Sequence, residues 1–183
     1  AKEQSAFCEI RLVDQYDEEV SDGQPGELAI RGPSLFSGYW GNEEANKEAF
    51  RNGWFHMGDV FKRDKMGLIN FVDRVKYMIK SGGENIYPAE IEQYILIDQR
   101  VSEVVVVRKK DSKWGEVPVA FISAVSNKLT EKDVLDMLKG KIASYKLPKE
   151  IYFVEPSFFP RTGTGKVQRH LVEKSLSRLD PKS

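Results

Sequence analysis

The stretch "VDRVKYMIKSGGENIYPAEIE", Val72–Glu92, is where the pattern of the chain changes. In it, an extended segment runs into the pair Gly82–Gly83, and a helix follows, because Pro88 suits the first turn of a helix. The residues before this stretch show the short alternating segments of β structure, whereas those after it combine strands with helices. We therefore expect two parts, with a boundary near residues 73–76.

Residues 1–73 predict a β-rich segment with one short helix. Turns rich in glycine and aspartate separate four strand candidates, which are "AFCEIRLVD", "ELAIRG", "WFHMGDVFKRD" and "GLINFVDR". In the second, Leu28 and Ile30 alternate with other residues, which is typical of a half-buried strand. The segment "NEEANKEAF" predicts the helix, because Asn42 is a favourable N-cap and two glutamates lie in the first turn.

Residues 74–183 predict a compact domain with the element order β-α-β-β-α-β-α, so the fold class is α+β. The four valines of "SEVVVVRKKD" indicate a buried strand. Thr130 and Asp133 form a capping-box pattern at the start of the second helix. The remaining elements are the strands "VPVAFISAV" and "EIYFVEP" and the helices "AEIEQYILID", "TEKDVLDMLKGKIASY" and "GKVQRHLVEKSLSRL".

The 183 residues carry no net formal charge, but the charges are unevenly divided. Residues 1–73 hold 8 Lys and Arg against 14 Asp and Glu, a net of −6, and residues 74–183 hold 20 against 14, a net of +6. The second half either binds an anionic ligand or attracts the acidic first half. Its cations are not interleaved with aromatic residues, which argues against a nucleic-acid-binding module.

Several other classes are disfavoured by the composition. One cysteine excludes an internal disulfide, and with two isolated histidines it makes a metal site improbable. No apolar run approaches the roughly 20 residues that cross a bilayer. The first residues lack the profile of a signal peptide, so we expect a cytoplasmic protein.

The glycine-rich stretch "PRTGTGKVQRH", Pro160–His170, resembles a phosphate loop only superficially. A P-loop requires Ser or Thr after the lysine, and Val167 stands there instead. Lys166 is then expected at the start of a helix, where the helix dipole and backbone N–H groups favour an anion. The alternative is a solvated lysine on a surface turn.

Two further stretches contain candidate ligand-binding residues. Asp59 follows Gly58 in a β-rich run, where its carboxylate can accept two vicinal hydroxyls, as an acidic residue does for ribose in dinucleotide folds. The alternative is a turn aspartate bonded to its own backbone. Gly82 and Gly83 permit close approach of a ligand or of another chain segment.

Taken together and in order, six segments closely resemble the adenylate-forming enzymes. These segments are "GELAIRGPSLFSGYW", "GWFHMGD", "FVDRVKYMIKSGGENIYPAEIE", "WGEVPVAFI", "YKLPKEIYFVE" and "PRTGTGKVQR". That superfamily contains acyl- and aryl-CoA synthetases, the adenylation domains of peptide synthetases, and luciferases. The versions here are most similar to fatty-acyl or aryl acid–CoA ligases. The resemblance implies that residues 1–73 are the β-rich tail of a large AMP-binding domain and residues 74–183 the mobile α+β lid.

The resemblance also implies a two-step reaction. A carboxylate attacks the α-phosphorus of Mg-ATP to give an acyl-adenylate and pyrophosphate, and the thiol of CoA then displaces AMP. Asp59 and Arg74 match the positions that hold the ribose hydroxyls. Lys166 matches the catalytic lysine, which bridges the carboxylate and α-phosphate oxygens in the first step.

Other positions are carried over in the same way. Lys76 matches the hinge about which the lid turns between the two steps. Ser81, Gly82 and Gly83 match the loop that meets the thiol. By similarity, Trp114, Tyr145 and Lys149 fall where some CoA ligases contact the CoA nucleotide.

ATP, Mg²⁺ and CoA are therefore the expected cofactors, with the metal bound mainly by the N-terminal domain, and a small carboxylic acid is the expected substrate. We expect that the chain alone is inactive, because nothing in it matches the phosphate loop of the large domain. Two alternatives remain at this stage. One is an adenylation module that loads a phosphopantetheine carrier protein. The end of the chain at "SRLDPKS", about where a stand-alone ligase would end, favours CoA over this alternative. The other is a non-catalytic binding module.

Overall fold

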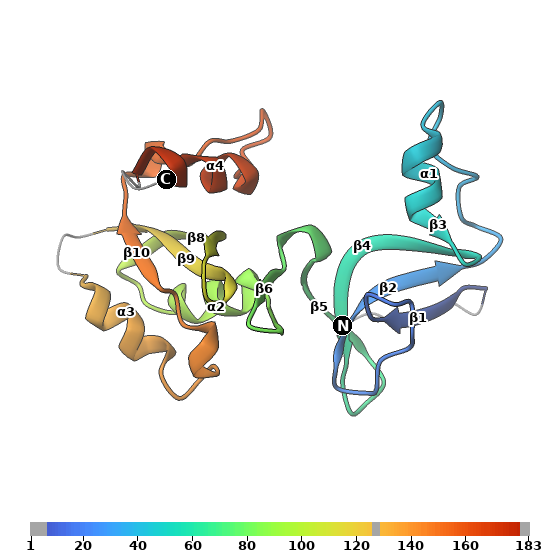
Figure 1. The fold of residues 1–183 in the computed structure, drawn as a ribbon, viewed down its shortest axis with the longest axis horizontal. Coiled ribbons are helices and arrows are strands. Elements are labelled where there is room, and N and C mark those ends of the chain that lie inside the picture. Colours follow the sequence, from blue (N-terminus) through green and yellow to red (C-terminus); the bar gives the residue numbers. More distant parts are fainter. Residues whose placement is uncertain (1–6, 126–128, 180–183) are drawn as a thin grey trace. The chain divides into compact units, whose positions relative to one another are not determined.

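A computed structural model describes residues 7–125 and 129–179 (Figure 1). The chain divides into two compact units, Ala1–Lys76 and Tyr77–Ser183. Each unit has its own sheet and its own buried side chains.

The first unit is an antiparallel sheet with one short helix. Its strands are arranged in the order β1-β2-β4-β3, and β5 pairs with β4 as well. The elements are β1 (Glu9–Val13), β2 (Pro25–Arg31), α1 (Glu43–Ala49), β3 (Phe50–Arg51), β4 (Trp54–Arg63) and β5 (Ile69–Arg74). The four predicted strands and the helix are thus confirmed, and the side chain of Asn42 caps α1 by accepting from the backbone N–H of Ala45.

The sheet of the first unit packs apolar side chains on both faces. Leu28 lies in one cluster with Leu12, Phe61 and Ile69, and Ile30 packs against the same cluster, which confirms the alternation. Ala29 points the other way and packs with Val13 and Trp54. The indole of Trp54 lies between the guanidinium groups of Arg11 and Arg31, whose central carbons are 4.6 and 4.5 Å from the ring centroid. The polar side chains of one face therefore cover its apolar residues.

The second unit is a mixed sheet with helices on both faces. The strand order is β10-β9-β6-β7, with β8 on the other side of β9. Only β10 runs parallel to its neighbour β9; the other pairs are antiparallel. The elements are η1 (Val75–Tyr77, a 3-10 turn that spans the unit boundary), β6 (Ile79–Ser81), β7 (Glu84–Ile86), α2 (Pro88–Ile95), β8 (Val101–Asp111), β9 (Gly115–Ala124), α3 (Glu131–Leu138), η2 (Ser144–Lys146), β10 (Glu150–Phe153), η3 (Pro156–Phe158) and α4 (Arg169–Leu179).

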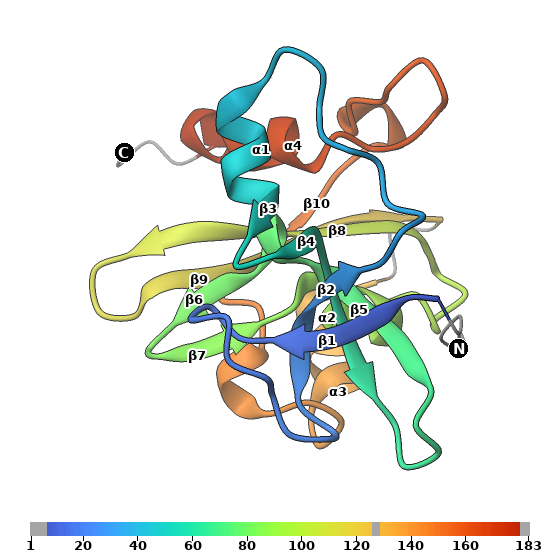
Figure 2. The same cartoon turned by 90° about the vertical axis from the view of Figure 1, so that its right-hand side faces the viewer.

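The valine run of β8 shows how this sheet is buried. Val104 and Val106 face a cluster that also contains residues of α2 and α3. Val105 and Val107 face a second cluster that contains Val172 and Leu176 of α4. Figures 1 and 2 show α3 and α4 on opposite sides of the sheet. A strand buried on both faces needs apolar residues at every position, which explains four consecutive valines.

The second unit differs from the prediction in three places. The glycine loop is the tip of a hairpin, β6–β7, that was not predicted. The helix α3 ends at Leu138 instead of extending to Tyr145, because Lys139 leaves the helical conformation and Gly140 adopts a positive φ of 74°. The last helix begins at Arg169, so Lys166 does not lie at a helix start. The capping box of Thr130 and Asp133 is confirmed.

No helix in residues 7–125 and 129–179 is long and apolar enough to cross a membrane.

Candidate functional site

Asp59 and Arg74 lie opposite each other on two neighbouring strands. They are register partners in the pairing of β4 with β5. The guanidinium Nε of Arg74 donates to Oδ1 of Asp59 at 2.7 Å, and the two side chains are 43% and 22% exposed. The alternative of a turn aspartate bonded to its own backbone does not describe this residue. The sheet therefore unites two predicted site residues in one accessible charge-assisted pair.

The conformation next to Asp59 depends on Glu27, a residue that the sequence analysis did not single out. Gly58 has a φ of +72°, and its backbone N–H donates to Oε1 of Glu27 at 3.0 Å. The other oxygen, Oε2, accepts from Arg51 at 2.9 Å and lies 3.2 Å from Nδ1 of the buried His56. Glu27 thus links β2 to the point of β4 from which Asp59 projects.

Arg51 completes this polar cluster. Its Nε donates to Oδ1 of Asp17 at 3.0 Å, in addition to its bond with Glu27. Burial acts to lower the pKa of Arg51, but the hydrogen bonds that it donates to Glu27 and Asp17 raise the pKa above its usual value. The sequence gives one indication of this polar cluster, which is the carboxylate of Glu27 in the apolar strand "ELAI". The partners of Glu27 lie 24 to 31 positions away in the sequence, so local patterns do not reveal these contacts.

Lys166 lies on a tight hairpin turn and is exposed. The backbone N–H of Gly165 donates to the carbonyl of Thr162 at 2.9 Å, and that of Thr162 donates to the carbonyl of Lys166 at 2.8 Å. The backbone N–H of Lys166 also donates to Oγ1 of Thr162 at 3.2 Å. Gly165 has a φ of +82°, which the turn requires and which glycine adopts without strain. The turn, and not a helix dipole, therefore fixes the backbone of Lys166.

Side chains brace both ends of this turn. Nη1 of Arg161 donates to the carbonyl of Gly165 at 3.1 Å, and its Nη2 pairs with Glu103 of β8 at 2.5 Å. Gln168 donates from its backbone N–H to the carbonyl of Pro160 at 2.8 Å and from Nε2 to that of Arg161 at 3.0 Å. The segment that carries Lys166 is consequently well ordered for a glycine-rich loop.

Gly82 and Gly83 form the two-residue turn of the β6–β7 hairpin. Ser81 and Glu84 are the last register pair before the turn, and the φ angles of the glycines are +59° and +88°. Two-residue hairpin turns with positive φ at both positions favour glycine strongly. Turn geometry alone therefore accounts for both glycines, and a ligand is not needed to explain them.

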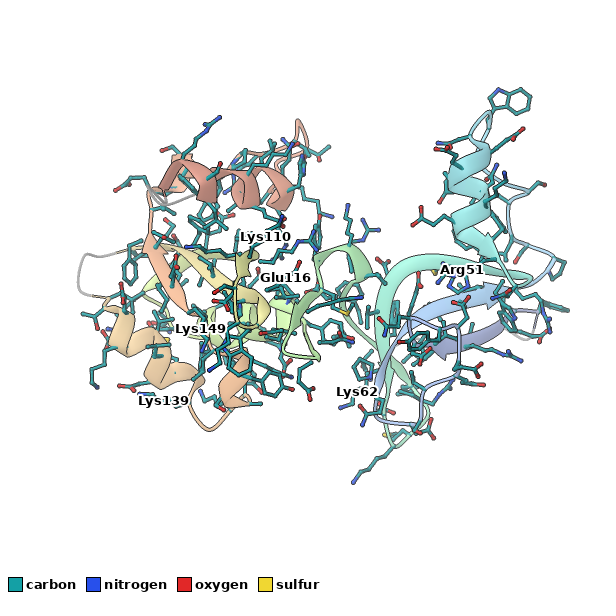
Figure 3. All side chains as sticks on the ribbon, viewed as in Figure 1. Arg51, Lys62, Lys110, Glu116, Lys139 and Lys149 are labelled. Atoms are coloured by element: carbon teal, nitrogen blue, oxygen red, sulfur yellow. The ribbon has the colours of Figure 1, made fainter. Side chains whose placement is uncertain are left out.

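Trp114 packs directly on this turn. The backbone N–H of Gly82 donates to the carbonyl of Trp114 at 2.8 Å, and a Cβ added to Gly82 would lie 2.8 Å from Cε3 of the indole. The backbone N–H of Lys80 donates to Oε2 of Glu116 at 2.9 Å, and Glu116 is labelled on the β8–β9 hairpin in Figure 3. Residues at the start of β9 thus fix the turn. Glu116, in the motif "WGE", is, like Glu27, a residue to which the sequence patterns assigned no role.

Lys149 and Tyr145 belong to the segment before β10. The pKa of Asp111 is lowered chiefly by hydrogen bonds from the backbone N–H groups of Trp114 and Lys113, with further lowering by the charge of Lys149. Lys149, labelled in Figure 3, is exposed, and the effect of its charge on Asp111 shows that it lies within electrostatic range of the turn that holds Trp114. The neighbour of Tyr145, Lys146, pairs with Glu90 of α2 at 2.7 Å. The expected CoA-binding residues are thus spread over three elements of one unit.

Lys76 is exposed and is the last residue of the first unit. It lies in the 3-10 turn η1. In the described part of the chain there is no group of three or more His, Cys, Asp or Glu side chains that could hold a metal ion.

Comparison with known proteins decides the family. Residues 90–166 match the family model "AMP-binding enzyme C-terminal domain". The chain is 40% identical over 172 residues to indoleacetate–CoA ligase of Aromatoleum aromaticum, which covers 93% of this chain and 33% of the relative. The chain belongs to the adenylate-forming AMP-binding enzymes.

Other members of this superfamily agree with that assignment. The chain is 41% identical over 157 residues to the long-chain-fatty-acid–CoA ligase FadD13 of Mycobacterium tuberculosis, which covers 86% of this chain and 31% of the relative. The o-succinylbenzoate CoA synthetase of Bacillus subtilis, solved with its acyl-adenylate intermediate, superposes with a TM-score of 0.81 at 32% identity over 92% of this chain and 34% of that one. The α+β fold class is confirmed. The chain spans about one third of the length of the relatives that it matches.

The geometry of the Gly82–Gly83 turn generates a prediction about stability. Gly82→Ala places a methyl group against the Trp114 ring at a left-handed φ, whereas Gly83→Ala meets the same left-handed strain with no atom within 4 Å of the added Cβ. We expect Gly83→Ala to cost about 1–2 kcal/mol and Gly82→Ala to cost more. Urea unfolding followed by circular dichroism measures both. Equal losses would show that Trp114 does not pack on the turn as described.

Proposed function

We propose that the intact protein is an AMP-forming acid–CoA ligase, which activates a carboxylic acid as acyl-adenylate and transfers the acyl group to CoA. The observation that carries this proposal is the 40% identity to indoleacetate–CoA ligase over 93% of the chain. In the proposal, residues 1–73 are the tail of the nucleotide-binding domain and residues 74–183 are the lid. Because the named relatives are CoA ligases, CoA is favoured over a carrier protein as the thiol.

In the first half-reaction, Asp59 and Arg74 bind the ribose of ATP. Arg74 occupies one carboxylate oxygen of Asp59, and a carboxylate accepts several further hydrogen bonds, so the pair suits a vicinal diol. Lys166 then contacts the attacking carboxylate and the α-phosphate. Negative charge accumulates on the phosphorus-bound oxygens in the transition state, and a cation held there by a closed lid lowers the barrier. The braced turn around Lys166 supports this role, because it lowers the entropy lost on placing the ammonium group.

In the second half-reaction, the lid turns about Lys76, and the hairpin of Ser81, Gly82 and Gly83 replaces Lys166 at the reacting centre. The thiol of CoA attacks the acyl carbonyl, and AMP leaves. Trp114, Tyr145 and Lys149 bind the nucleotide part of CoA in this proposal. The exposed indole supports it, since Trp114 is 43% exposed although it packs on Gly82.

The charges of the two halves are consistent with this sequence of steps. The +6 of residues 74–183 favours closure over the polyanions ATP and CoA. Magnesium would bind the phosphates of ATP and residues of the large N-terminal domain, which lies outside this chain. No step assigned to this chain depends on the metal.

A direct test of the proposed function is acid-dependent exchange of pyrophosphate into ATP by the full-length protein. We expect exchange with at least one member of a panel of aliphatic and aromatic acids, and CoA-dependent release of AMP with the same acid. Residues 1–183 alone should give no exchange, because the relatives are about three times longer than this chain. Failure of the full-length protein with every acid, or exchange by this chain alone, would overturn the proposal.

The two half-reactions should respond in opposite ways to changes at Lys166 and Lys76. Lys166→Ala removes the cation of the first step and should reduce exchange by at least about 100-fold. It should largely spare thioester formation from supplied acyl-adenylate. Lys76→Pro fixes φ at the boundary between the units and should do the reverse. Rapid-quench assays of each half-reaction in the full-length protein measure these effects, and equal damage to both half-reactions by both variants would contradict the alternating lid.

A further inference from the structure

Arg169, the first residue of α4, forms a bidentate ion pair with Glu92 of α2. Nη1 lies 2.6 Å from Oε1 of Glu92, and Nη2 lies 3.0 Å from Oε2. The two side chains are only 16% and 13% exposed, so this is the most buried Arg–carboxylate pair of the second unit among residues 7–125 and 129–179. Its two parallel hydrogen bonds fix both the distance and the angle between the side chains.

The same pair also holds the middle of β8. Nη1 of Arg169 donates to the backbone carbonyl of Val106. Oε1 of Glu92 accepts from the backbone N–H of Val106 at 2.6 Å. One residue of the central strand is therefore bound on both its donor and its acceptor by the two members of the ion pair.

A fourth contact reaches the segment that follows Lys76. The central guanidinium carbon of Arg169 lies 4.9 Å from the ring centroid of Tyr77, which is a cation–π distance. Tyr77 is the first residue of the second unit. Arg169 thus joins α4, α2, β8 and the start of the unit at one guanidinium group.

Apolar packing already attaches α4 to the sheet without this pair. Val172 is fully buried and Leu176 is 7% exposed against Val105, Val107 and Phe121. A buried ion pair contributes little to stability compared with apolar residues of similar volume, but it specifies one arrangement. Arg169 therefore fixes the position of the first turn of α4, which follows the hairpin of Lys166.

We propose that Arg169 is a positioning residue for Lys166 in the first half-reaction. This inference rests on the role proposed above for Lys166. Gln168, between them, bonds back to Pro160 and Arg161, so the hairpin and the first turn of α4 move together. The hairpin of Gly82 and Gly83 is held instead by Trp114 and Glu116, which belong to the β8–β9 hairpin.

The chain provides a matched control for this pair. Nε of Arg108 on β8 pairs with Oε1 of Glu173 on α4 at 3.0 Å, and the two side chains are 35% and 32% exposed. This pair also ties α4 to β8, but Glu173 lies one turn further along the helix and away from the Lys166 hairpin. Arg108→Met therefore removes another ion pair that anchors α4, at a point one turn beyond the start of the helix.

The experiment compares Arg169→Met with Arg108→Met in the full-length protein. We expect Arg169→Met to lower the rate of acyl-adenylate formation by about 10–100-fold and to leave thioester formation from supplied acyl-adenylate unchanged, because a misplaced group loses that order of rate. Arg108→Met should change neither rate. Arg169→Lys keeps the charge but not the fork and should recover part of the loss. Glu92→Gln keeps an acceptor for Val106 and removes the charge pair, so it replaces Arg169→Met if that variant fails to fold.

A second measurement does not depend on activity. Hydrogen–deuterium exchange of the peptide 160–168 reports the amides of Thr162, Gly165, Lys166 and Gln168, which are hydrogen-bonded within the hairpin. Exchange of this peptide should be faster in Arg169→Met and Glu92→Gln than in Arg108→Met. If the wild-type protein activates no acid, the proposed function fails. The exchange of peptide 160–168 then still decides whether Arg169 fixes the hairpin of Lys166. Unchanged exchange, or equal loss of both half-reactions, overturns it.

Discussion

The pairing of β8 with β9 is the interaction on which the second unit depends. This hairpin is buried on both faces over most of its length, so apolar burial supplies its stability, and the helices on the two faces take their places from it. At its tip, Trp114 and Glu116 hold the glycine turn of β6–β7. In its middle, Val106 is bound by Glu92 of α2, which follows the glycine hairpin in sequence, and by Arg169 of α4, which follows the hairpin of Lys166. Two segments that the proposed mechanism uses, far apart in sequence, are thereby attached to the same pair of strands.

In the first unit, the carboxylate of Asp59 projects from the middle of strand β4. Gly58 turns β4 with a positive φ, and Glu27 satisfies its N–H. The cost of burying Glu27 is offset by the hydrogen bonds that it accepts from Arg51 and from the backbone N–H of Gly58. Asp59 then pairs with Arg74, and both side chains are partly exposed.

Local sequence signals predicted the elements better than their ends. The valine run, the N-cap Asn42 and the capping box of Thr130 each act within a few residues, and the structure confirms all three. The end of α3 and the start of α4 depend on the conformations of Gly140 and of the hairpin 161–167, which periodicity does not report. Arg169 and Glu92 are 77 positions apart, so their contact exists only in the folded chain. Asp59, Arg74 and Lys166 were recognised by family resemblance, because their individual patterns also fit ordinary turns.

In the proposed mechanism, the two units change their relative position between the half-reactions. This change is measured most directly by the distance distribution between spin labels on Lys62→Cys and Lys139→Cys in the full-length protein, with Cys8 and every other native cysteine replaced by serine (Figure 3). Lys62 and Lys139 are both exposed and belong to different units. The account predicts one distribution with ATP and a non-reactive acid analogue, and a clearly different one with a stable acyl-adenylate analogue and CoA. A single distribution, unchanged by either set of ligands, would contradict it.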